Sequence, residues 1–354
     1  MILVLNAGSS SLKIAVFDDK LSPKMRGQIS GIGGLGRLTL GEESSDITSA
    51  DHAHANDLML AALGAKGYSL SAFRAAAHRV VHGGEELTRA CRIDDDTLRT
   101  IKGCAALAPL HIPPALAGIE TLALRAPDLW QSASFDTAFH AGQSDLATTY
   151  ALPASIRARG IRRFGFHGLS YSGLVESLDD QLPSRLLALH LGAGVSLCAI
   201  RDGMSVATSM GYSPISGTPM GTRVGDIDAA AVLRLVAEDG PAATEALLNR
   251  QSGLLGLSGI TANMHSLLTD PSPAAAFAVD HFCYWIARQA GSMIAAMEGV
   301  DAIAFTGGIG ENSVEIRNNI TARLRWAGDL PVHVVKADEE RVIASEALAL
   351  LAAG

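Results

Sequence analysis

The sequence predicts a two-domain α/β fold in which one unit, a strand, a glycine turn and a second strand, is used twice. The first copy, ILVLNAGSSSLKIAVFDD, opens the chain, and the second, LLALHLGAGVSLCAIRDG, spans 186–203. In each copy two apolar runs flank a short turn, which is the pattern of a β-hairpin. This repetition predicts two similar domains that face one cleft. Overlaid without a gap, the copies match Asn6 with His190, Gly8 with Gly192, Ala15 with Ala199 and Asp18 with Asp202.

Length and composition support this division into two domains. A chain of 354 residues is too long for one ordinary core. A hydrophobic content of 48% with 18% charged residues is typical of a well-buried enzyme and excludes a disordered or fibrous chain. The net charge of -8 argues against nucleic-acid and anionic-membrane partners, so a phosphate site must be built from local cations.

The cysteines and the apolar segments indicate the compartment. The four cysteines show neither C-x-x-C nor zinc-ligand spacing, which predicts free thiols in a reducing environment and no structural metal. Charged residues interrupt the most apolar stretch, Ala274 to Met297, so we expect it to be a buried helix rather than a membrane span. No basic leader precedes the first strand. We therefore expect a cytoplasmic protein.

The first hairpin turn has the chemistry of a phosphate site. Gly8 allows the backbone to approach a ligand closely, the three serines that follow offer donors, and Lys13 adds a positive charge. An ordinary turn whose serines satisfy backbone amides is the alternative.

The rest of the first domain reads as a mixture of strands and helices. A Gly-rich, weakly patterned stretch at 29–43 precedes a helix around 57–63 and a strand that leads into HRVVHGGEE. Alternation places Arg79 and Val81 on one face of that strand and Val80 on the other. A surface arginine at a strand edge is an equally good interpretation.

Two further segments supply candidate site residues. LAPLHIPPA places His111 on a proline-punctuated loop, and SASFDTAFH runs a short strand into Asp136. The carboxyl end of such a strand is where α/β folds bind ligands, although Asp136 could also cap the next segment. After a domain boundary near 150–153, RARGIRRFGFHG carries His167, either a group that faces an anion or a turn histidine.

The second domain contains a long polar loop. Thr208 to Asp228 is rich in glycine, and its apolar residues argue for a functional loop rather than disorder. Arg223 is the only cation of this loop. Helices are expected at about 229–238 and 242–250, followed by the apolar helix from Ala274.

A third glycine turn follows the next strand. DAIAFTGGIGENSVEIR predicts a strand, a glycine turn and a helix start at 309–313, whose free amides favour a phosphate or nucleoside. The final expected helix spans 338–353.

Nine motifs in order along nearly the whole chain resemble acetate kinases: NAGSSSLK, HRVVHGGE, PLHIPP, FDTAFH, RRFGFHG, HLGAG, TSMGYSP, PMGTRVGDID and FTGGIGENS. The resemblance implies a duplicated actin/hexokinase-like (ribonuclease H-like) α/β fold with an interdomain active-site cleft. It implies an N-terminal domain of 1–149 plus about 335–354 and a nucleotide-binding domain of 150–334.

The same resemblance implies an activity. Acetate kinases transfer the terminal phosphoryl group of ATP to acetate, reversibly and with Mg²⁺, to give acetyl phosphate and ADP, and they are homodimers. Propionate and butyrate kinases share this plan, but the bulk of Val81 is similar to that of acetate-preferring members.

Motif by motif, the resemblance implies roles for individual residues. The catalytic residues are Arg79, Asp136, His167 and Arg223, and the metal ligands are Asn6 and Glu339. The substrate-binding residues are Arg79, Val81, Leu110, His111, Phe166 and Pro214. The nucleotide-binding residues are Ser9, Ser11, Lys13, His190, Leu191, Gly192, Ala193, Gly194, Asn263, Met264, His265, Gly308, Ile309, Gly310, Glu311 and Asn312.

Elementary chemistry agrees with these roles. A carboxylate is already ionised at neutral pH and needs no base, so the obstacle is the approach of one anion to another. Arginines, a histidine and magnesium lower that barrier, and losing one such contact typically costs about 3 kcal/mol. On this argument Asp136 orients Arg79, Arg223 or a metal-bound water rather than abstracting a proton.

Several positions depart from the family pattern, mostly on the nucleotide side. Ala193 replaces an asparagine, and Asn263 and His265 replace an aspartate and an arginine, while Ile112 and Tyr171 break two other motifs. A different nucleotide, pyrophosphate as donor, or a nucleotide-binding homologue without turnover therefore remain alternatives.

Overall fold

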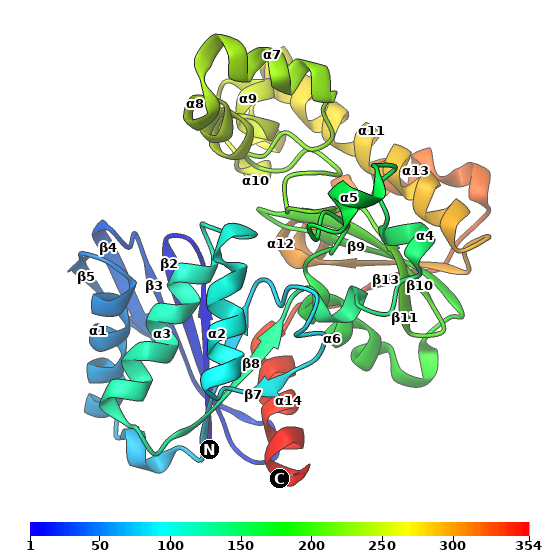
Figure 1. Cartoon of the computed structure of the whole chain (residues 1–354). Coiled ribbons are helices and arrows are strands. Elements are labelled where there is room, and N and C mark those ends of the chain that lie inside the picture. The colour runs from blue at the N-terminus through cyan, green and yellow to red at the C-terminus, as the bar shows by residue number, and fades with distance from the viewer. Residues whose placement is uncertain (354) are drawn as a thin grey trace. The chain divides into compact units, whose positions relative to one another are not determined.

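The computed structural model describes residues 1–353, which form two compact units. The first unit contains Met1–Phe139 and the segment that starts at Asp338, and the second contains His140–Ala337. The chain therefore begins and ends in the same unit, as the blue and red ends of the ribbon show in Figure 1. The domain boundaries at 149/150 and about 335 stay a prediction.

The first unit is built on an eight-stranded sheet of order β5-β4-β3-β2-β1-β6-β8-β7. β1 pairs in parallel with β6, and β6 with β8, whereas the other neighbours are antiparallel. Its strands are β1 Ile2–Ala7, β2 Ser11–Phe17, β3 Pro23–Ser30, β4 Gly34–Leu40, β5 Glu43–Ser49, β6 Ala75–Val80, β7 Cys91–Arg92 and β8 Trp130–Phe135. Its helices are α1 His52–Ala65, α2 Asp95–Gly103, α3 Ile112–Arg125 and α14 Glu339–Ala353.

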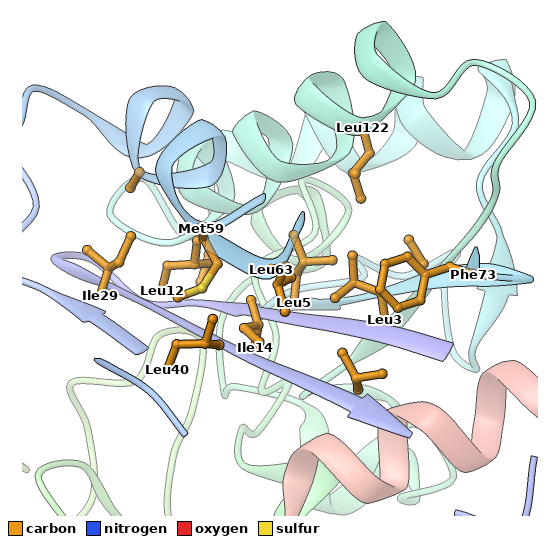
Figure 2. Close-up of a cluster of buried hydrophobic side chains, with 14 residues drawn as sticks. Leu3, Leu5, Leu12, Ile14, Ile29, Leu40, Met59, Leu63, Phe73 and Leu122 are labelled. Carbon is orange, nitrogen blue, oxygen red and sulfur yellow. The ribbon is translucent and has the colours of Figure 1, made fainter. Parts of the chain in front are cut away.

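Strand alternation decides which face of this sheet each side chain meets. Leu3 and Leu5 of β1 point toward α1 and α3 and join the apolar cluster in Figure 2, together with Met59 and Leu122 from those helices. Asn6 has the opposite parity, and its side chain meets α14 on the other face. One face is therefore a closed core, while the other carries polar groups beneath α14.

The second unit repeats the first. Its sheet has the order β11-β10-β9-β12-β13, with antiparallel β11, β10 and β9 and parallel β12 and β13. The strands β3-β2-β1-β6-β8 have the same order and the same directions. The predicted duplicated α/β fold is confirmed at this level. These strands are β9 Arg185–Leu191, β10 Val195–Arg201, β11 Met204–Thr208, β12 Ala302–Thr306 and β13 Val332–Val334.

In sequence, the helices of the second unit either precede its first strand or connect its later strands. They are α4 Asp145–Thr148, α5 Ala154–Arg157, α6 Gly168–Leu178, α7 Ala229–Asp239, α8 Pro241–Ala246, α9 Gly253–Ser258, α10 Met264–Thr269, α11 Pro273–Ala296, α12 Gly307–Asn312 and α13 Val314–Arg323. Within residues 1–353, none of the helices combines the length and the apolar character that a bilayer crossing requires.

The two hairpins have the same design but different turns, so the gapless overlay is wrong beyond the turn. Ala7 pairs with Leu12 across the first turn, whereas Leu191 pairs with Val195 across the second, which is one residue shorter. No single offset therefore aligns both strands. The glycine position is nevertheless shared, because Gly8 donates to the carbonyl of Ser11 and Gly192 to that of Gly194.

Three local expectations also need correction. The stretch 29–43 is not irregular, because it holds the end of β3, all of β4 and the start of β5. Val81 lies just beyond the end of β6 rather than within the strand, while His111 lies as expected in the turn that leads into α3, as its N-cap. The third glycine turn is the short helix α12, which begins at Gly307.

Candidate active site

In the first unit, the site is centred on an ion pair between neighbouring parallel strands. Arg79 of β6 pairs in register with Ser134 of β8, and Asp136 follows that strand by one residue. Asp136 accepts from Arg79 Nε at 2.9 Å and from Arg79 Nη2 at 2.5 Å. Asp136 is only 1% exposed, so its charge depends on this guanidinium. Arg79 is thus a partly buried, oriented cation, with 15% of its side chain exposed.

Asn6 and the start of α14 complete this group. Arg79 Nη1 donates to Asn6 Oδ1 at 3.1 Å, and Asn6 Nδ2 donates to Glu340 Oε1 at 2.9 Å. Glu339 lies 3.9 Å from Arg79 Nε. The carboxylate bonded to Asn6 is therefore Glu340, which the sequence analysis did not name, while Glu339 faces Arg79.

Three carboxylates, of Asp136, Glu339 and Glu340, outnumber the two arginines that face them, Arg79 and Arg26, whose Nη1 donates to Glu340 Oε2 at 3.4 Å. Burial together with the charges of Asp136 and Glu340 raises the pKa of Glu339, although Arg79 opposes this shift. Burial alone would lower the pKa of Arg79, but the same carboxylates raise it above its usual value, so the guanidinium stays charged.

A divalent cation would relieve this imbalance. Carboxylate and amide oxygens are hard ligands, and Mg²⁺ usually takes only one or two carboxylates beside waters and substrate phosphates. Asn6, Glu339 and Glu340 offer such oxygens at one place. Among residues 1–353, no three or more His, Cys, Asp and Glu side chains form a ready-made metal cage.

The first hairpin turn presents its polar groups to solvent. Ser9 and Lys13 are exposed and Ser11 is half-buried. Lys13 pairs with Asn6 across the hairpin, so the two side chains share a face. His52 Nε2 lies 2.8 Å from the carbonyl oxygen of Gly8 and ties α1 to the turn.

The predicted substrate-binding residues divide between the units. In the first unit, Val81 is buried two residues beyond Arg79, and Leu110 and His111 are half-buried just before α3. In the second unit, Phe166 is buried and Pro214 is half-buried.

In the second unit, His167 is held by a hydrogen-bond network. It has a left-handed backbone, with φ of 60°, immediately before α6. Its Nδ1 lies 2.8 Å from Ser196 Oγ, and its ring stacks on His190 at 4.2 Å. A left-handed backbone is costly for a residue other than glycine and often marks a functional site.

Arg223 lies on the same side of the second hairpin turn as His167. A methyl group added to Gly194 would lie 3.1 Å from His167 Nε2 and 3.5 Å from Arg223 Nη1. Arg223 Nη1 also donates to the carbonyl of Pro214 at 3.2 Å. The long polar loop is tied to this turn, because Gly221 N donates to the carbonyl of Ala193.

A cavity of about 690 Å³ in the second unit gathers half of the predicted nucleotide residues. Apolar groups of Leu268, Ile309 and Val314 contribute to its wall. The predicted residues that line it are Gly192, Ala193, Asn263, Met264, His265, Gly308, Ile309 and Asn312. Five others are absent from its lining: His190, Leu191, Gly194, Gly310 and Glu311.

Contacts explain two of these absences. Leu191 is completely buried in the core, and Glu311 Oε1 instead accepts from the backbone N–H of Ala337. Of the residues that the sequence analysis missed, Ser196 lies four residues after Gly192, and only a knowledge of hairpin register would place it beside His190.

A duplicated α/β fold, a partly buried arginine beside carboxylates and a cavity near glycine turns are typical of a phosphotransferase of the two-domain kinase class. The Acetokinase family model matches residues 1–348. The chain belongs to the acetokinase family.

Individual relatives agree with this assignment. The chain is 40% identical over 388 aligned positions to the acetate kinase of Nitrobacter hamburgensis, covering 99% of this chain and 96% of that one. A crystal structure of Porphyromonas gingivalis acetate kinase matches with a TM-score of 0.89 at 30% identity, over 99% of both chains. A propionate kinase from Francisella tularensis matches with a TM-score of 0.91 at 32% identity, over 98% of both chains.

Proposed function

We propose that this protein is an acetate kinase that transfers the γ-phosphoryl group of ATP to acetate, giving acetyl phosphate and ADP. The observation that carries this proposal is the partly buried Arg79 with its remaining N–H donors. Three of its five N–H groups are used by Asp136 and Asn6, which leaves one hydrogen on each Nη atom. Two such hydrogens match the two oxygens of a carboxylate.

The transfer itself is a direct displacement. A carboxylate oxygen of acetate attacks the γ-phosphorus as the bond to the bridging oxygen of ADP breaks, and no proton has to move. Arg79 holds the attacking carboxylate, while His167 and Arg223 stabilise the equatorial phosphoryl oxygens. Asp136 gives both its oxygens to Arg79, so its role is to orient that cation.

We assign a Mg²⁺ site to Asn6 and Glu339, with Glu340 as a third ligand. The excess of carboxylates and the raised pKa of Glu339 support this assignment. When bound, the ion neutralises phosphate charge and orients the terminal phosphoryl group.

A nucleotide is the donor that we favour over pyrophosphate. The cavity beside Gly192 and Ala193 has about 690 Å³ and apolar walls, which fits a nucleoside and has no use in binding pyrophosphate. Exposed His265 lies at its edge, where it can contact a base, whereas Asn263 Oδ1 already accepts from the backbone N–H of Ser266 as the N-cap of α10.

The test is an acetyl phosphate assay with hydroxylamine as the trap. Acetate and Mg²⁺ are held fixed while ATP, GTP, inosine triphosphate and pyrophosphate are compared as donors. We expect product with ATP and a loss of at least about 100-fold in the Arg79→Met variant. Absence of product with every donor would reject the activity, and tight nucleotide binding in that case would indicate a non-catalytic homologue.

A propionate kinase is the second candidate, because a propionate kinase is among the similar solved structures. The same assay across acetate, propionate and butyrate separates the two. Val81 predicts the highest kcat/KM with acetate, and Val81→Ala should shift the preference toward propionate by about tenfold.

We also propose a cytoplasmic homodimer. Phe277 and Tyr284, two turns apart on α11, are 58% and 51% exposed, and Leu233 on α7 is 70% exposed. Exposed apolar groups of this size favour a protein partner. Light scattering after size exclusion should report a dimer for the parent and a monomer for the Phe277→Glu, Tyr284→Glu double variant. A parent monomer at micromolar concentration would refute the dimer.

A further inference from the structure

Asp226, near the end of the long polar loop, joins the two limbs of that loop. Its Oδ1 accepts from the backbone N–H of Gly217 at 2.7 Å, and its own backbone N–H donates to the carbonyl of Gly217 at 2.8 Å. Asp226 is exposed but Gly217 is buried, so the carboxylate reaches inward to satisfy a backbone amide of a buried residue. These two bonds, the loop clasp, close residues 217–226 into a ring that includes Arg223.

Helix α11 braces the loop clasp from outside the loop. The second carboxylate oxygen of Asp226, Oδ2, accepts from Gln289 Nε2 at 2.6 Å. A carboxylate can only accept, and here each of its oxygens meets an N–H donor. One exposed side chain therefore ties both limbs of an irregular loop to a helix of 24 residues.

Glycines let the two limbs lie close enough for this clasp. A Cβ on Gly225 would lie 2.7 Å from the backbone nitrogen of Pro219, and a Cβ on Gly217 would lie 2.9 Å from the carbonyl oxygen of Ser209. Cavities of about 420 and 570 Å³ border this end of the loop, and Asp226 lines both. Because side-chain packing is incomplete there, polar bonds have to hold the end of the loop.

The loop clasp acts on Arg223 through Pro214. Arg223 Nη1 donates to the carbonyl of Pro214 at 3.2 Å, so the backbone of one limb holds a guanidinium that the other limb carries. Pro214 lies three residues before Gly217, where the clasp joins the limbs. If the limbs separate, the carbonyl and the guanidinium separate with them.

We propose that Asp226 is a positioning residue, whose clasp to Gly217 and brace to Gln289 hold Pro214 and Arg223 in one relative arrangement. Asp226 acts through the loop rather than on the reacting groups. Its effect on phosphoryl transfer rests on the proposed function, whereas the holding of the loop does not.

Hydrogen exchange of the full-length protein, read by mass spectrometry, tests the clasp without any activity. Asp226→Ala should speed exchange in peptides within 213–223 by at least about tenfold, because the limbs then open more often. Asp226→Asn keeps an oxygen for the Gly217 N–H, so its exchange should stay close to that of the parent. Unchanged exchange in Asp226→Ala would overturn the proposal.

Asp228→Ala is the matched control. Asp228 lies two residues further on, and its carboxylate also accepts from a backbone N–H at 2.7 Å, but that N–H belongs to Ala230 in the first turn of α7. Exchange should therefore rise at the start of α7 and not within 213–223.

Kinetics test whether the held loop matters for transfer. Asp226→Ala should lower kcat at least about tenfold, because Arg223 is misplaced. It should also raise KM for acetate, since Pro214 moves with the loop, while KM for ATP stays within about twofold. Gln289→Ala should lower kcat less, and the double variant should be no slower than Asp226→Ala, because the brace acts through Asp226. Asp228→Ala should keep the parent kcat.

The outcomes separate the positioning role from the proposed function. Faster exchange with a parent-like kcat in Asp226→Ala refutes the positioning role and leaves the proposed function intact. An equal loss of kcat in Asp226→Asn and Asp226→Ala would also refute it, because the charge and not the clasp would then matter. A parent that transfers no phosphoryl group to any acceptor refutes the proposed function, and exchange alone then decides on the clasp. If Asp226→Ala does not fold, parent-like exchange within 213–223 in Gln289→Ala refutes the proposal.

Discussion

Arg79 and Asp136 form an ion pair in which each charge offsets the cost of removing the other from water. Asp136 is almost completely buried, and both of its oxygens bond to the guanidinium. Removing one partner of such a pair leaves an unpaired charge in a poorly solvated place, which costs more than the pair itself contributes.

Arg79→Met should therefore lower the free energy of unfolding by about 3 kcal/mol, measured by urea titration. Arg125→Met is the control, because Arg125 pairs with Asp57 on the surface and should lose no more than about 1 kcal/mol. Equal losses in the two variants would mean that Asp136 finds another partner.

His78 gives the first unit an acid sensitivity. Burial lowers its pKa to about 4, although a hydrogen bond to Gln131 opposes the shift. The unfolded chain, with an ordinary pKa of about 6.5, binds a proton first as the pH falls. His78 therefore causes no loss in the free energy of unfolding above pH 6.5, and it causes a growing loss as the pH falls from there toward 4.

In His78→Gln, the free energy of unfolding should fall less steeply with decreasing pH, by about 1.4 kcal/mol per pH unit, as judged from urea midpoints at pH 7 and pH 5. The exposed His54→Gln serves as the reference and should retain the parent slope. An identical slope in His78→Gln would assign the acid sensitivity to other groups, among them His82, whose pKa burial also lowers to about 4.

The second hairpin places its turn against His167 and Arg223. A Cβ on Gly194 would be closer to His167 Nε2 than ordinary contact allows, so the ring must move. Gly194→Ala should thus lower kcat at least about tenfold with little change in stability. Gly64→Ala in α1 meets no atom within 4 Å, and we expect unchanged activity and slightly higher stability. Parent-like kcat in Gly194→Ala would show that this turn does not constrain His167.

The strong hairpins were predictable because their strands are buried on both faces and read as apolar runs. The strands β4 and β5 were not predicted. β5 is mostly exposed at the sheet edge and its neighbour β4 is mostly half-buried, so backbone pairing holds them and their side chains carry little apolar pattern.

Glycine signals were similarly incomplete. Gly307 has φ of 78°, and a side chain there would lie 2.8 Å from the carbonyl of Leu191, so the glycine is required. The positive φ is needed where the chain enters helix α12, and a glycine in this position is easily interpreted from sequence as part of a turn.

Part of the site followed from simple rules. Arg79 and Asp136 lie near the carboxyl ends of adjacent parallel strands, where α/β sites gather. The choice between Glu339 and Glu340 did not follow, because it depends on the rotation of α14 about its axis. Tyr171 likewise looked only like a departure from a motif, since its partner Ser196 is remote in sequence.

The chain as a whole is a first unit interrupted by a second. Helix α14 contributes buried Val342, Ile343 and Ala347 to the sheet of the first unit. Deleting residues 338–354 should abolish slow hydrogen exchange in β1 and β6 while β9 and β10 stay protected. Removing only 352–354 should change neither unit. Retained protection in β1 after the longer deletion would show that the sheet does not need α14.

Because the second unit is inserted into the first, the second unit can fold completely before the first during synthesis, which reverses the usual order. A ribosome makes residues 140–337 after the first sheet and before its covering helix α14. At a synthesis rate of about 5–20 residues per second, roughly ten seconds or longer pass between synthesis of the strands that carry Asn6 and Arg79 and synthesis of Glu339 and Glu340. The later half can thus mature while the earlier half is still open, and nascent protein needs protection from aggregation mainly at its amino-terminal sheet.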